Sequence, residues 1–216
     1  SSGGFKTTDV PTGARSLSLR LRLIRRRFSD VMPMTTESRT YVGCRQDPLR
    51  ARYRTEPEVA RVTDRARATG GAELDPFHGR VVPGTDGGES VLAVGAHAAV
   101  GGYHDKPNPG DLLCAALASC FDSTIRMIAD RLGVRLTRLE VDVTADVDVR
   151  GALMVDQDTP VGFTAMRCHV DMEPVEGTPQ NVIDGLIAAA ERCCIVMNTL
   201  RGGVPVTTTV GSRSSR

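Results

Sequence analysis

The sequence predicts an α+β fold with antiparallel sheets. Two long segments, residues 108–133 and 178–203, combine helical spacing of apolar residues with helix-capping residues at their ends. A third segment, residues 136–149, alternates apolar and polar residues as a half-buried strand does. The expected order is a β-meander, a helix, two strands, a helix and a strand. Because strands and helices do not alternate strictly, an antiparallel arrangement is favoured over a parallel one.

The composition is that of an ordinary globular protein. The chain has 216 residues, of which 40% are hydrophobic and 25% charged, so it is long enough to bury a core. The net charge of +1, the 4% aromatic content and the lack of Trp do not point to a nucleic-acid partner. No uninterrupted apolar run reaches the length of about 18 residues that a membrane span needs. We therefore expect neither nucleic acid nor a membrane as partner.

Residues 1–33 differ from the rest of the chain in charge. They carry seven basic and two acidic residues, which leaves a net charge of −4 for residues 34–216. The stretch "SLSLRLRLIRRRF" could form an amphipathic strand, act as an Arg-rich targeting segment, or be an extension outside the fold. We expect a basic, poorly ordered N-terminal extension over 1–33 and a single domain over 34–216.

Short β-like runs fill the next part of the chain. Residues 40–70 are charged, and "PEVARVTDRARATGG" suggests one strand before the break at Gly70 and Gly71. "FHGRVVPG" and "ESVLAVGAHAAVGG" are punctuated by glycine and proline. We expect these runs to form a β-meander.

The first long helix has local signals at both ends. Asn108 can cap it, Pro109 suits the first helical position, and Asp111 lies in the first turn. Arg131 lies in the last turn and Gly133 can close the helix. The expected apolar stripe is Leu113, Leu117, Cys120, Thr124 and Met127.

Two strands are expected after this helix. In "RLTRLEVDVTADVDVRG" every second residue is apolar, which predicts a long strand with one buried face. A second strand is expected over "GFTAMRCHVDMEP". The two should pair antiparallel, because only about a dozen turn-like residues separate them, too few for a crossover helix. The predicted buried positions are Leu139, Val141, Val143, Ala145, Val147, Val149, Phe163, Ala165, Cys168, Val170 and Met172.

The second helix is expected from Thr178, as cap, to the pair Gly202 and Gly203. Its apolar side would carry Cys193 and Cys194 late in the helix. "VPVTTTV" after the glycines is expected to be a closing strand.

Six cysteines occur, at positions 44, 114, 120, 168, 193 and 194. With no CxxC and no zinc-finger spacing to histidine, they are interpreted as reduced thiols rather than metal ligands. Adjacent helical residues point about 100° apart, so a disulfide between Cys193 and Cys194 is not expected. Cys120 could approach one of these two cysteines and form a redox pair, or all six could be packing residues.

The sequence around the cysteines resembles that of the OsmC/Ohr family (osmotically inducible protein C / organic hydroperoxide resistance), and the resemblance extends over about residues 59–210. "NPGDLLCAALASCFDST" is similar to the family's "nPxELlxAALaxC" helix, and "CIVMNTL" from Cys194 is similar to its "CPxSxxL" segment. The segment "VGGYHDKPNPGDLL", which leads into this helix, is also similar to the family's sequence at this point. This resemblance implies an OsmC-like fold, with antiparallel sheets packed on two long central helices, and an intertwined homodimer with its sites at the subunit interface.

The resemblance also implies roles for single residues. It places the peroxidatic cysteine at Cys120 and the resolving cysteine at Cys194, and leaves Cys193 at a position that is not cysteine in the family. The family activates its first cysteine with an arginine held by an acid. Gly110 stands at the acid's position here, and the adjacent Asp111 could either hold the arginine or favour the helix N-terminus.

Arg80 is the first choice for the activating arginine. The alternatives are Arg65 and Arg67, and each of the three could instead be a solvated strand residue. His104 could line the mouth of the site or be an exposed loop residue.

By this resemblance the expected function is a cytoplasmic thiol-dependent peroxidase that reduces organic hydroperoxides with a dithiol reductant. Apolar residues near Cys120 suit an organic peroxide, and neither cofactor nor metal is expected. The alternative is a non-enzymatic domain of the same fold that binds an apolar ligand or a partner. Gly110 and the unassigned arginine favour that alternative.

Overall fold

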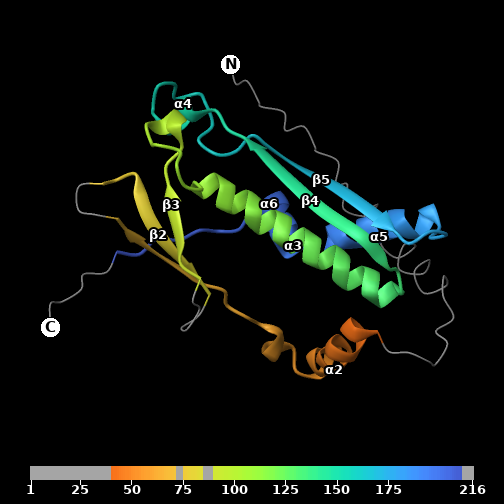
Figure 1. The fold of residues 1–216 in the computed structure, drawn as a ribbon. Coiled ribbons are helices and arrows are strands. Elements are labelled where there is room, and N and C mark those ends of the chain that lie inside the picture. Colours follow the sequence, from red (N-terminus) through yellow and green to blue (C-terminus); the bar gives the residue numbers. More distant parts are fainter. Residues whose placement is uncertain (1–39, 72–74, 85–89, 211–216) are drawn as a thin grey trace, which may run out of the picture. The chain divides into compact units, whose positions relative to one another are not determined.

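The computed structural model describes residues 40–71, 75–84 and 90–210 (Figure 1). They belong to one unit, residues 40–216. The extension expected over 1–33 lies outside the described residues.

The predicted meander is a three-stranded antiparallel sheet. It consists of β1 (Ala66–Gly70), β2 (His78–Pro83) and β3 (Leu92–Gly95), in the order β1-β2-β3. The register pairs Thr69 with Arg80, and Arg80 with Ala93. The short 3₁₀ helices Pro57–Ala60 and Ala98–Val100 precede and follow this sheet in the chain.

A helix that the sequence did not predict, α2 (Tyr41–Thr55), precedes the sheet. It contains Pro48 and lacks an apolar stripe. Thr40 caps it by accepting from the N–H of Gly43 at 3.0 Å. Tertiary bonds add to this cap: the N–H of Val42 donates to Asp130 at 2.8 Å, and Arg131 pairs with Asp47 at 2.9 Å. Both partners lie at the C-terminal end of the next helix, so α2 depends on that helix rather than on its own periodicity.

The first long helix, α3 (Pro109–Leu132), follows the prediction closely. The Asn108 side chain accepts from the N–H groups of Gly110 and Asp111, and Gly133 closes the helix in the left-handed conformation with φ 68°. The stripe is shifted slightly, because Met127 is 38% exposed. The buried residues are Leu117, Phe121, Thr124, Ile125 and Ala129.

Among the described helices, α3 alone has the length and apolar content that could cross a membrane, a pattern the sequence analysis did not anticipate. In the structure its buried stripe contacts β4, α5 and α6. These contacts are those of a core helix.

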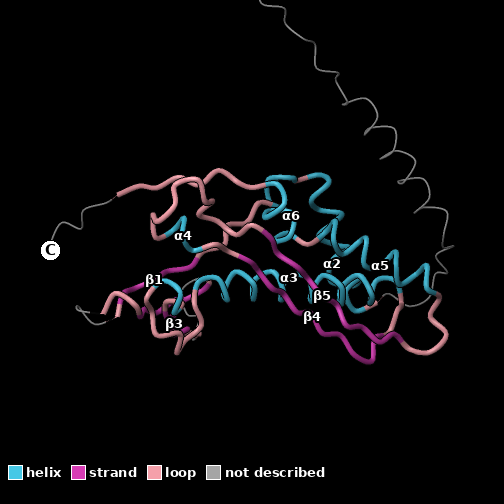
Figure 2. Tube along the Cα trace, turned by 90° about the horizontal axis from the view of Figure 1, so that it is seen from above, coloured by secondary structure: helices cyan, strands magenta, loops and turns pink. Residues whose placement is uncertain are grey.

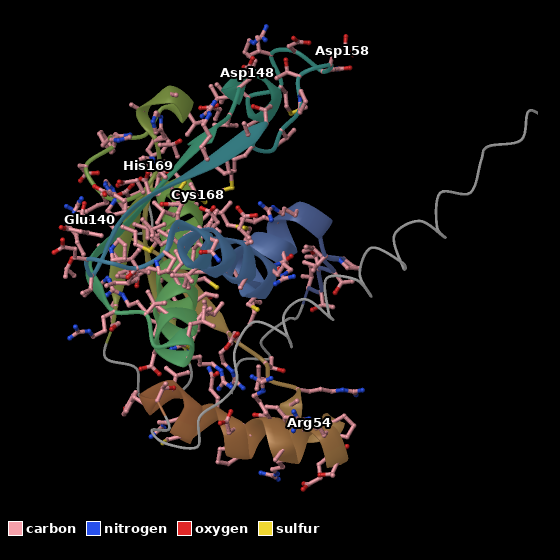
Figure 3. All side chains as sticks on the ribbon, turned by 90° about the vertical axis from the view of Figure 1, so that its right-hand side faces the viewer. Arg54, Glu140, Asp148, Asp158, Cys168 and His169 are labelled. Carbon is pink, nitrogen blue, oxygen red and sulfur yellow. The ribbon has the colours of Figure 1, made fainter. Side chains whose placement is uncertain are left out.

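The second sheet is the predicted antiparallel pair, β4 (Leu136–Asp146) and β5 (Ala165–Pro174). It runs alongside α3 (Figure 2). Cys168 of β5 packs against the core, whereas its neighbour His169 and Glu140 of β4 are exposed (Figure 3). The predicted strand was too long, because the chain leaves the sheet at Asp146 and enters the short helix α4 (Val149–Ala152).

The prediction of one continuous second helix is wrong, because the structure has two helices there. α5 (Gln180–Cys193) and α6 (Ile195–Gly202) are separated at Cys194, whose backbone is extended with φ −68° and ψ 111°. The start is also shifted: Pro179 is the N-cap, and the Thr178 hydroxyl donates to the carbonyl of Val175 at 2.7 Å. The end near Gly202 and Gly203 agrees with the prediction.

The closing strand expected over "VPVTTTV" is absent from the structure. Residues 203–210 carry no secondary structure, and Val206 is 87% exposed. Within the described ranges no strand offers this segment a hydrogen-bonded partner. The fold class is nevertheless as predicted, an α+β arrangement with antiparallel sheets and a core between α3, the second sheet, α5 and α6.

Candidate thiol site

The site forms where the middle of α3 meets the α5–α6 junction. Cys120 is on α3, half-buried, and Cys194 is the residue between α5 and α6, with 0% exposure. Their side chains lie within hydrogen-bonding reach of each other. The structure therefore brings together the two cysteines that the resemblance paired, and neither of these two forms a disulfide.

The break at Cys194 creates a helix N-terminus beside Cys120. Cys194 is the N-cap of α6, so the N–H groups of Ile195 and Val196 have no acceptor within the helix. Both lie within hydrogen-bonding reach of the Cys120 sulfur. An uninterrupted helix would have directed the same N–H groups at its own carbonyls.

This arrangement lowers the pKa of Cys120. Burial is the largest single influence and raises the pKa of the thiol. The N–H of Val196, the Cys194 thiol, the N–H of Ile195 and the Thr124 hydroxyl together outweigh burial, and the pKa falls below that of a free cysteine. Hydrogen-bond donors and a helix N-terminus stabilise the thiolate, which is the nucleophilic form.

The pKa of Cys194 moves in the opposite direction. Burial raises the pKa of this thiol most, and although the N–H of Met197 lowers it, the neighbouring Cys120 raises it again. The directions of the two shifts favour the thiolate on Cys120 and the neutral thiol on Cys194. An attacking thiol has to be a thiolate before the reaction starts, whereas its partner is needed only afterwards.

The three candidate arginines lie elsewhere. Arg80 is an exposed residue of β2, Arg67 lies on β1, and Arg65 immediately precedes that strand. None of their guanidinium groups makes an ion pair or a hydrogen bond with a residue in the described ranges. The structure thus gives no arginine to Cys120 from within the described part of this chain.

Asp111 completes the cap of α3. Its carboxylate accepts from the backbone N–H of Asn108 at 2.9 Å and from the Asn108 side chain at 2.6 Å. The sequence left two roles open for Asp111, holding an arginine or stabilising the N-terminus of α3, and the geometry favours the second. Gly110 is confined: a Cβ there would lie 2.9 Å from Asn108 Oδ1 and 3.0 Å from Phe163 Cζ. The space for an acid at position 110 is taken by Phe163.

The histidines form two separate groups. His104 is exposed, has a positive φ of 54°, and its ring contacts the ring of His97 edge to face. His78 was not singled out by the sequence, yet its ring lies between Asp75 at 2.6 Å and Asp105 at 2.9 Å and stacks on Tyr103. Asp105, followed by Asp75, raises the pKa of His78. This cluster links β2 to the loop before α3.

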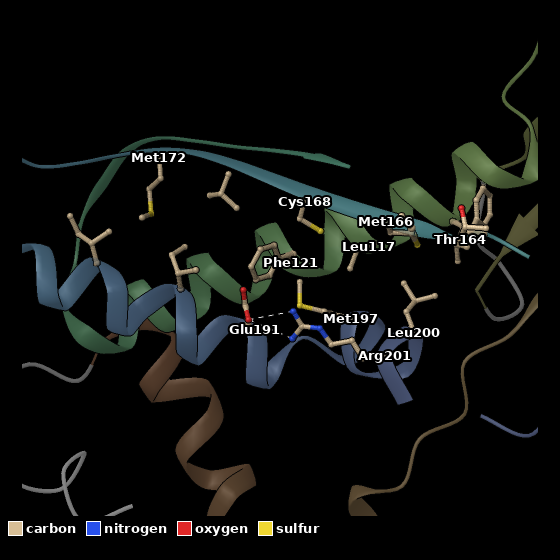
Figure 4. Close-up of a pocket in the computed structure, with 16 residues that line it drawn as sticks. Leu117, Phe121, Thr164, Met166, Cys168, Met172, Glu191, Met197, Leu200 and Arg201 are labelled. Atoms are coloured by element: carbon tan, nitrogen blue, oxygen red, sulfur yellow. Dashed lines mark hydrogen bonds and ion pairs between the residues drawn. The ribbon is translucent and has the colours of Figure 1, made fainter. Parts of the chain in front are cut away.

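A cavity of about 910 Å³ lies between α3, β5, α5 and α6 (Figure 4). Its walls are mostly apolar, and Leu117 and Phe121 place it one helical turn or less from Cys120 along α3. Glu191 and Arg201, paired at 3.4 Å, lie at its edge. The other lining residues include Leu113, Met166, Cys168, Met172, Met197 and Leu200.

The remaining cysteines differ from the pair. Cys193 is exposed at the end of α5, and burial raises the pKa of both Cys114 and Cys168. In the part of the chain that the structure describes, no group of three or more His, Cys, Asp or Glu side chains is placed to hold a metal ion.

Sequence reasoning missed the groups that act on Cys120, namely the N–H groups of Ile195 and Val196 and the Thr124 hydroxyl. Thr124 was placed on the apolar stripe, and its one hydroxyl proton is shared between the Cys120 carbonyl, at 2.7 Å, and the Cys120 sulfur. The family pattern "CPxSxxL" has a proline directly after the second cysteine, where proline would favour a new helix start. Ile195 stands at this position, so the local signal for the break is missing.

Comparison with known proteins shows the family to which the chain belongs. A family model described as "OsmC-like protein" matches residues 102–209, which include both cysteines of the pair. Among curated protein sequences, none matches the chain.

Two solved structures with TM-scores above 0.5 share the fold, and a third is similar in sequence. An OsmC-like protein from Mycoplasma pneumoniae is 16% identical, with a TM-score of 0.53, covering 66% of this chain and 89% of its own. An OsmC-like protein of unknown function from Vibrio cholerae is 14% identical, with a TM-score of 0.51, covering 64% and 94%. An organic hydroperoxide resistance protein from Legionella pneumophila is 25% identical, with a TM-score of 0.46, covering 65% and 90%.

The family match spans half of the chain and contains α3, the second sheet and the α5–α6 junction. The chain therefore belongs to the family of OsmC-like proteins.

Proposed function

We propose that the protein is a thiol-dependent peroxidase that reduces organic hydroperoxides, with Cys120 as the peroxidatic and Cys194 as the resolving cysteine. The observation that carries the proposal is the placement of two thiols side by side, Cys120 in the middle of α3 and the fully buried Cys194 at the α5–α6 junction. The pKa of Cys120 is lowered and that of Cys194 is raised. Membership of the OsmC-like family supports the reaction class.

The reaction has three balanced steps. The Cys120 thiolate attacks the terminal peroxide oxygen, the O–O bond breaks, and the alkoxide takes a proton and leaves as an alcohol. Cys120 is then a sulfenic acid. The sulfur of Cys194 attacks it, forming the disulfide and releasing water. An external dithiol reduces this disulfide and is itself oxidised.

The first turn of α6 would replace the family's arginine in this mechanism. Donors aimed at a developing or existing anion act strongly where water is excluded, and they need no reorganisation during the reaction. The N–H groups of Ile195 and Val196 have this placement relative to Cys120. The thiolate can thus form without a guanidinium from the described part of the chain.

The cavity beside α3 would hold the organic part of the substrate. Leu117 and Phe121 line it on the helix that carries Cys120, and Met197 lines it on the helix whose first turn faces Cys120. Apolar walls of this kind favour an organic peroxide over hydrogen peroxide.

The test is consumption of cumene hydroperoxide with dithiothreitol as reductant, for the wild type, Cys120→Ser, Cys194→Ser and Cys193→Ser. We expect Cys120→Ser to lose turnover. We expect Cys194→Ser, given the peroxide before any dithiol is added, to react once and to keep Cys120 as a sulfenic acid or a higher oxide. Cys193→Ser is the matched control, because this exposed neighbour has no role in the proposed steps. Full turnover by Cys120→Ser would contradict the mechanism.

The cavity also supports a second candidate, a non-enzymatic domain that binds an apolar ligand. Its volume of about 910 Å³ is within the range of small-molecule sites. Slow modification of Cys120 by iodoacetamide at neutral pH, together with tight binding of an apolar dye, would favour this candidate over the peroxidase.

A further inference from the structure

Asn198 lies across the α5–α6 junction and joins its two sides. The break leaves carbonyl groups at the end of α5 without the N–H donors that a continuing helix would provide. The side-chain amide of Asn198 donates to the carbonyls of Glu191 at 2.9 Å and Arg192 at 3.3 Å. It also donates to the carbonyl of Cys194 at 2.8 Å.

The first two of these bonds are unusual for a helical asparagine. A polar side chain within a helix commonly bonds the carbonyl four residues earlier, and the bond to Cys194 is of this kind. Glu191 and Arg192 are seven and six residues earlier and belong to the preceding helix. These two bonds therefore fix α6 relative to α5.

Besides these bonds, α6 packs against the core through Met197 and the partly buried Val196. It has only eight residues, and Met197 is its one buried residue. The Arg201–Glu191 ion pair also spans the junction, but both side chains are largely exposed, and exposed pairs contribute little. The direction of the first turn of α6 is thus set by the packing of Val196 and Met197 together with the amide of Asn198. The bonds of this amide to Glu191 and Arg192 tie α6 to the end of α5.

We propose that Asn198 is a positioning residue that holds the N–H groups of Ile195 and Val196 on the sulfur of Cys120. This proposal deepens the proposed function and rests on it, because the positioned group is the attacking thiol. Asn198 itself is exposed, so replacing it should leave the core intact. Its loss should therefore alter the ionisation of Cys120 more than the stability of the fold.

The test is the pH dependence of Cys120 modification by iodoacetamide, followed by peptide mass spectrometry so that each cysteine is resolved. Asn198→Ala removes all three bonds, and Asn198→Ser can retain only the bond to the carbonyl of Cys194. We expect both variants to raise the midpoint by about half to one pH unit and to slow modification at pH 7 by about 3–10-fold. Thr199→Ala, the exposed neighbour on α6, is the control and should keep the wild-type midpoint.

Unchanged midpoints in both variants would overturn the proposal, even if their melting temperatures fell, because a merely structural role would lower stability alone. A wild-type midpoint in Asn198→Ser would also overturn it, since the bond within α6 would then suffice. If Asn198→Ala does not fold, Asn198→Ser decides between the two results. Peroxide turnover of the wild type is measured in parallel: without turnover the peroxidase proposal fails, whereas a shifted midpoint still supports the role of Asn198.

Discussion

Single residues decide how this chain differs from the pattern of its family. The family's acid position is Gly110, and the structure explains the glycine by packing, because Phe163 and the Asn108 cap occupy the space a side chain would need. Asp111, the nearest carboxylate, is used by the cap. Among the described residues, the groups that lower the pKa of Cys120 are hydrogen-bond donors, including the backbone N–H groups of Ile195 and Val196, and not a pair of charged side chains.

The packing of Gly110 makes a prediction about stability. We expect Gly110→Ala to lower the free energy of unfolding by about 1 kcal/mol or more, because the new Cβ crowds the Asn108 cap. Gly185→Ala is the matched control: it lies inside α5 with nothing within 4 Å of its Cβ, so it should stabilise by about 0.5–1 kcal/mol. Urea denaturation measures both. A Gly110→Ala variant as stable as Gly185→Ala would contradict this account of position 110.

At the scale of elements, the decisive feature is that one expected helix is two. The break at Cys194 converts N–H groups that would be used inside a helix into donors for Cys120. The cap at the start of α3 and the histidine cluster beside β2 are the other local devices that position the site's elements.

The cap role of Asp111 can be separated from a role in holding an arginine. We expect Asp111→Ala to lower the free energy of unfolding by about 0.5–2 kcal/mol through loss of the cap. Asp111→Asn keeps an acceptor oxygen and should lose less. In both variants kcat/KM for the peroxide should stay within about twofold of the wild type, which steady-state kinetics checks. A large fall in kcat/KM with little change in stability would instead support the arginine-holding role.

The His78 cluster predicts a pH-dependent contribution to stability. Because Asp105 and Asp75 raise the pKa of His78 in the folded protein, the stabilisation is complete below the unfolded value of about 6.5 and is lost as the pH rises through the higher folded value. We expect the melting-temperature difference between the wild type and His78→Gln to be largest between about pH 5 and 6.5 and to shrink above that range. His104→Asn, which tolerates a positive φ, is the control. A difference that grows with pH would refute the assignment.

At the scale of the whole molecule, elements with local sequence signals were predicted, and an element that depends on tertiary contacts was not. α3 was foreseen because Asn108, Pro109 and Gly133 are local signals. β4 and β5 were foreseen from alternation. α2 was missed because it has a cap residue, Thr40, but no apolar stripe, and because it contacts residues almost 90 positions later.

Of the site, the sequence predicted the two cysteines but not the groups that act on them. The pairing of Cys120 with Cys194 came from the motifs, whereas the donors to Cys120 depend on a break that has no local signal, since Ile195 stands where the family pattern has proline. The activating arginine could not be identified from the sequence. Several arginines share the strand-rich region, and spacing alone does not show which guanidinium could reach a thiol.

The assembly state stays a prediction of the resemblance, which implies a homodimer. The segment 203–210 was expected to be a strand and finds no strand partner among the described residues, although Val204, Val206 and Val210 are exposed. A sheet edge of a second chain could pair with it. We expect sedimentation equilibrium to give about twice the chain mass of 23.1 kDa, and Val206→Asp to weaken the association. A monomer at micromolar concentration would contradict the prediction.

The central claim is that Cys120 is the thiolate that meets the peroxide and Cys194 is its partner. The most direct measurement is peptide mass spectrometry of the reduced protein after one equivalent of cumene hydroperoxide. The account predicts a single new disulfide joining the Cys120 and Cys194 peptides, while Cys193 and Cys168 stay reduced. A protein whose Cys120 stays a free thiol after this treatment, or one in which Cys193 forms the disulfide instead, would contradict it.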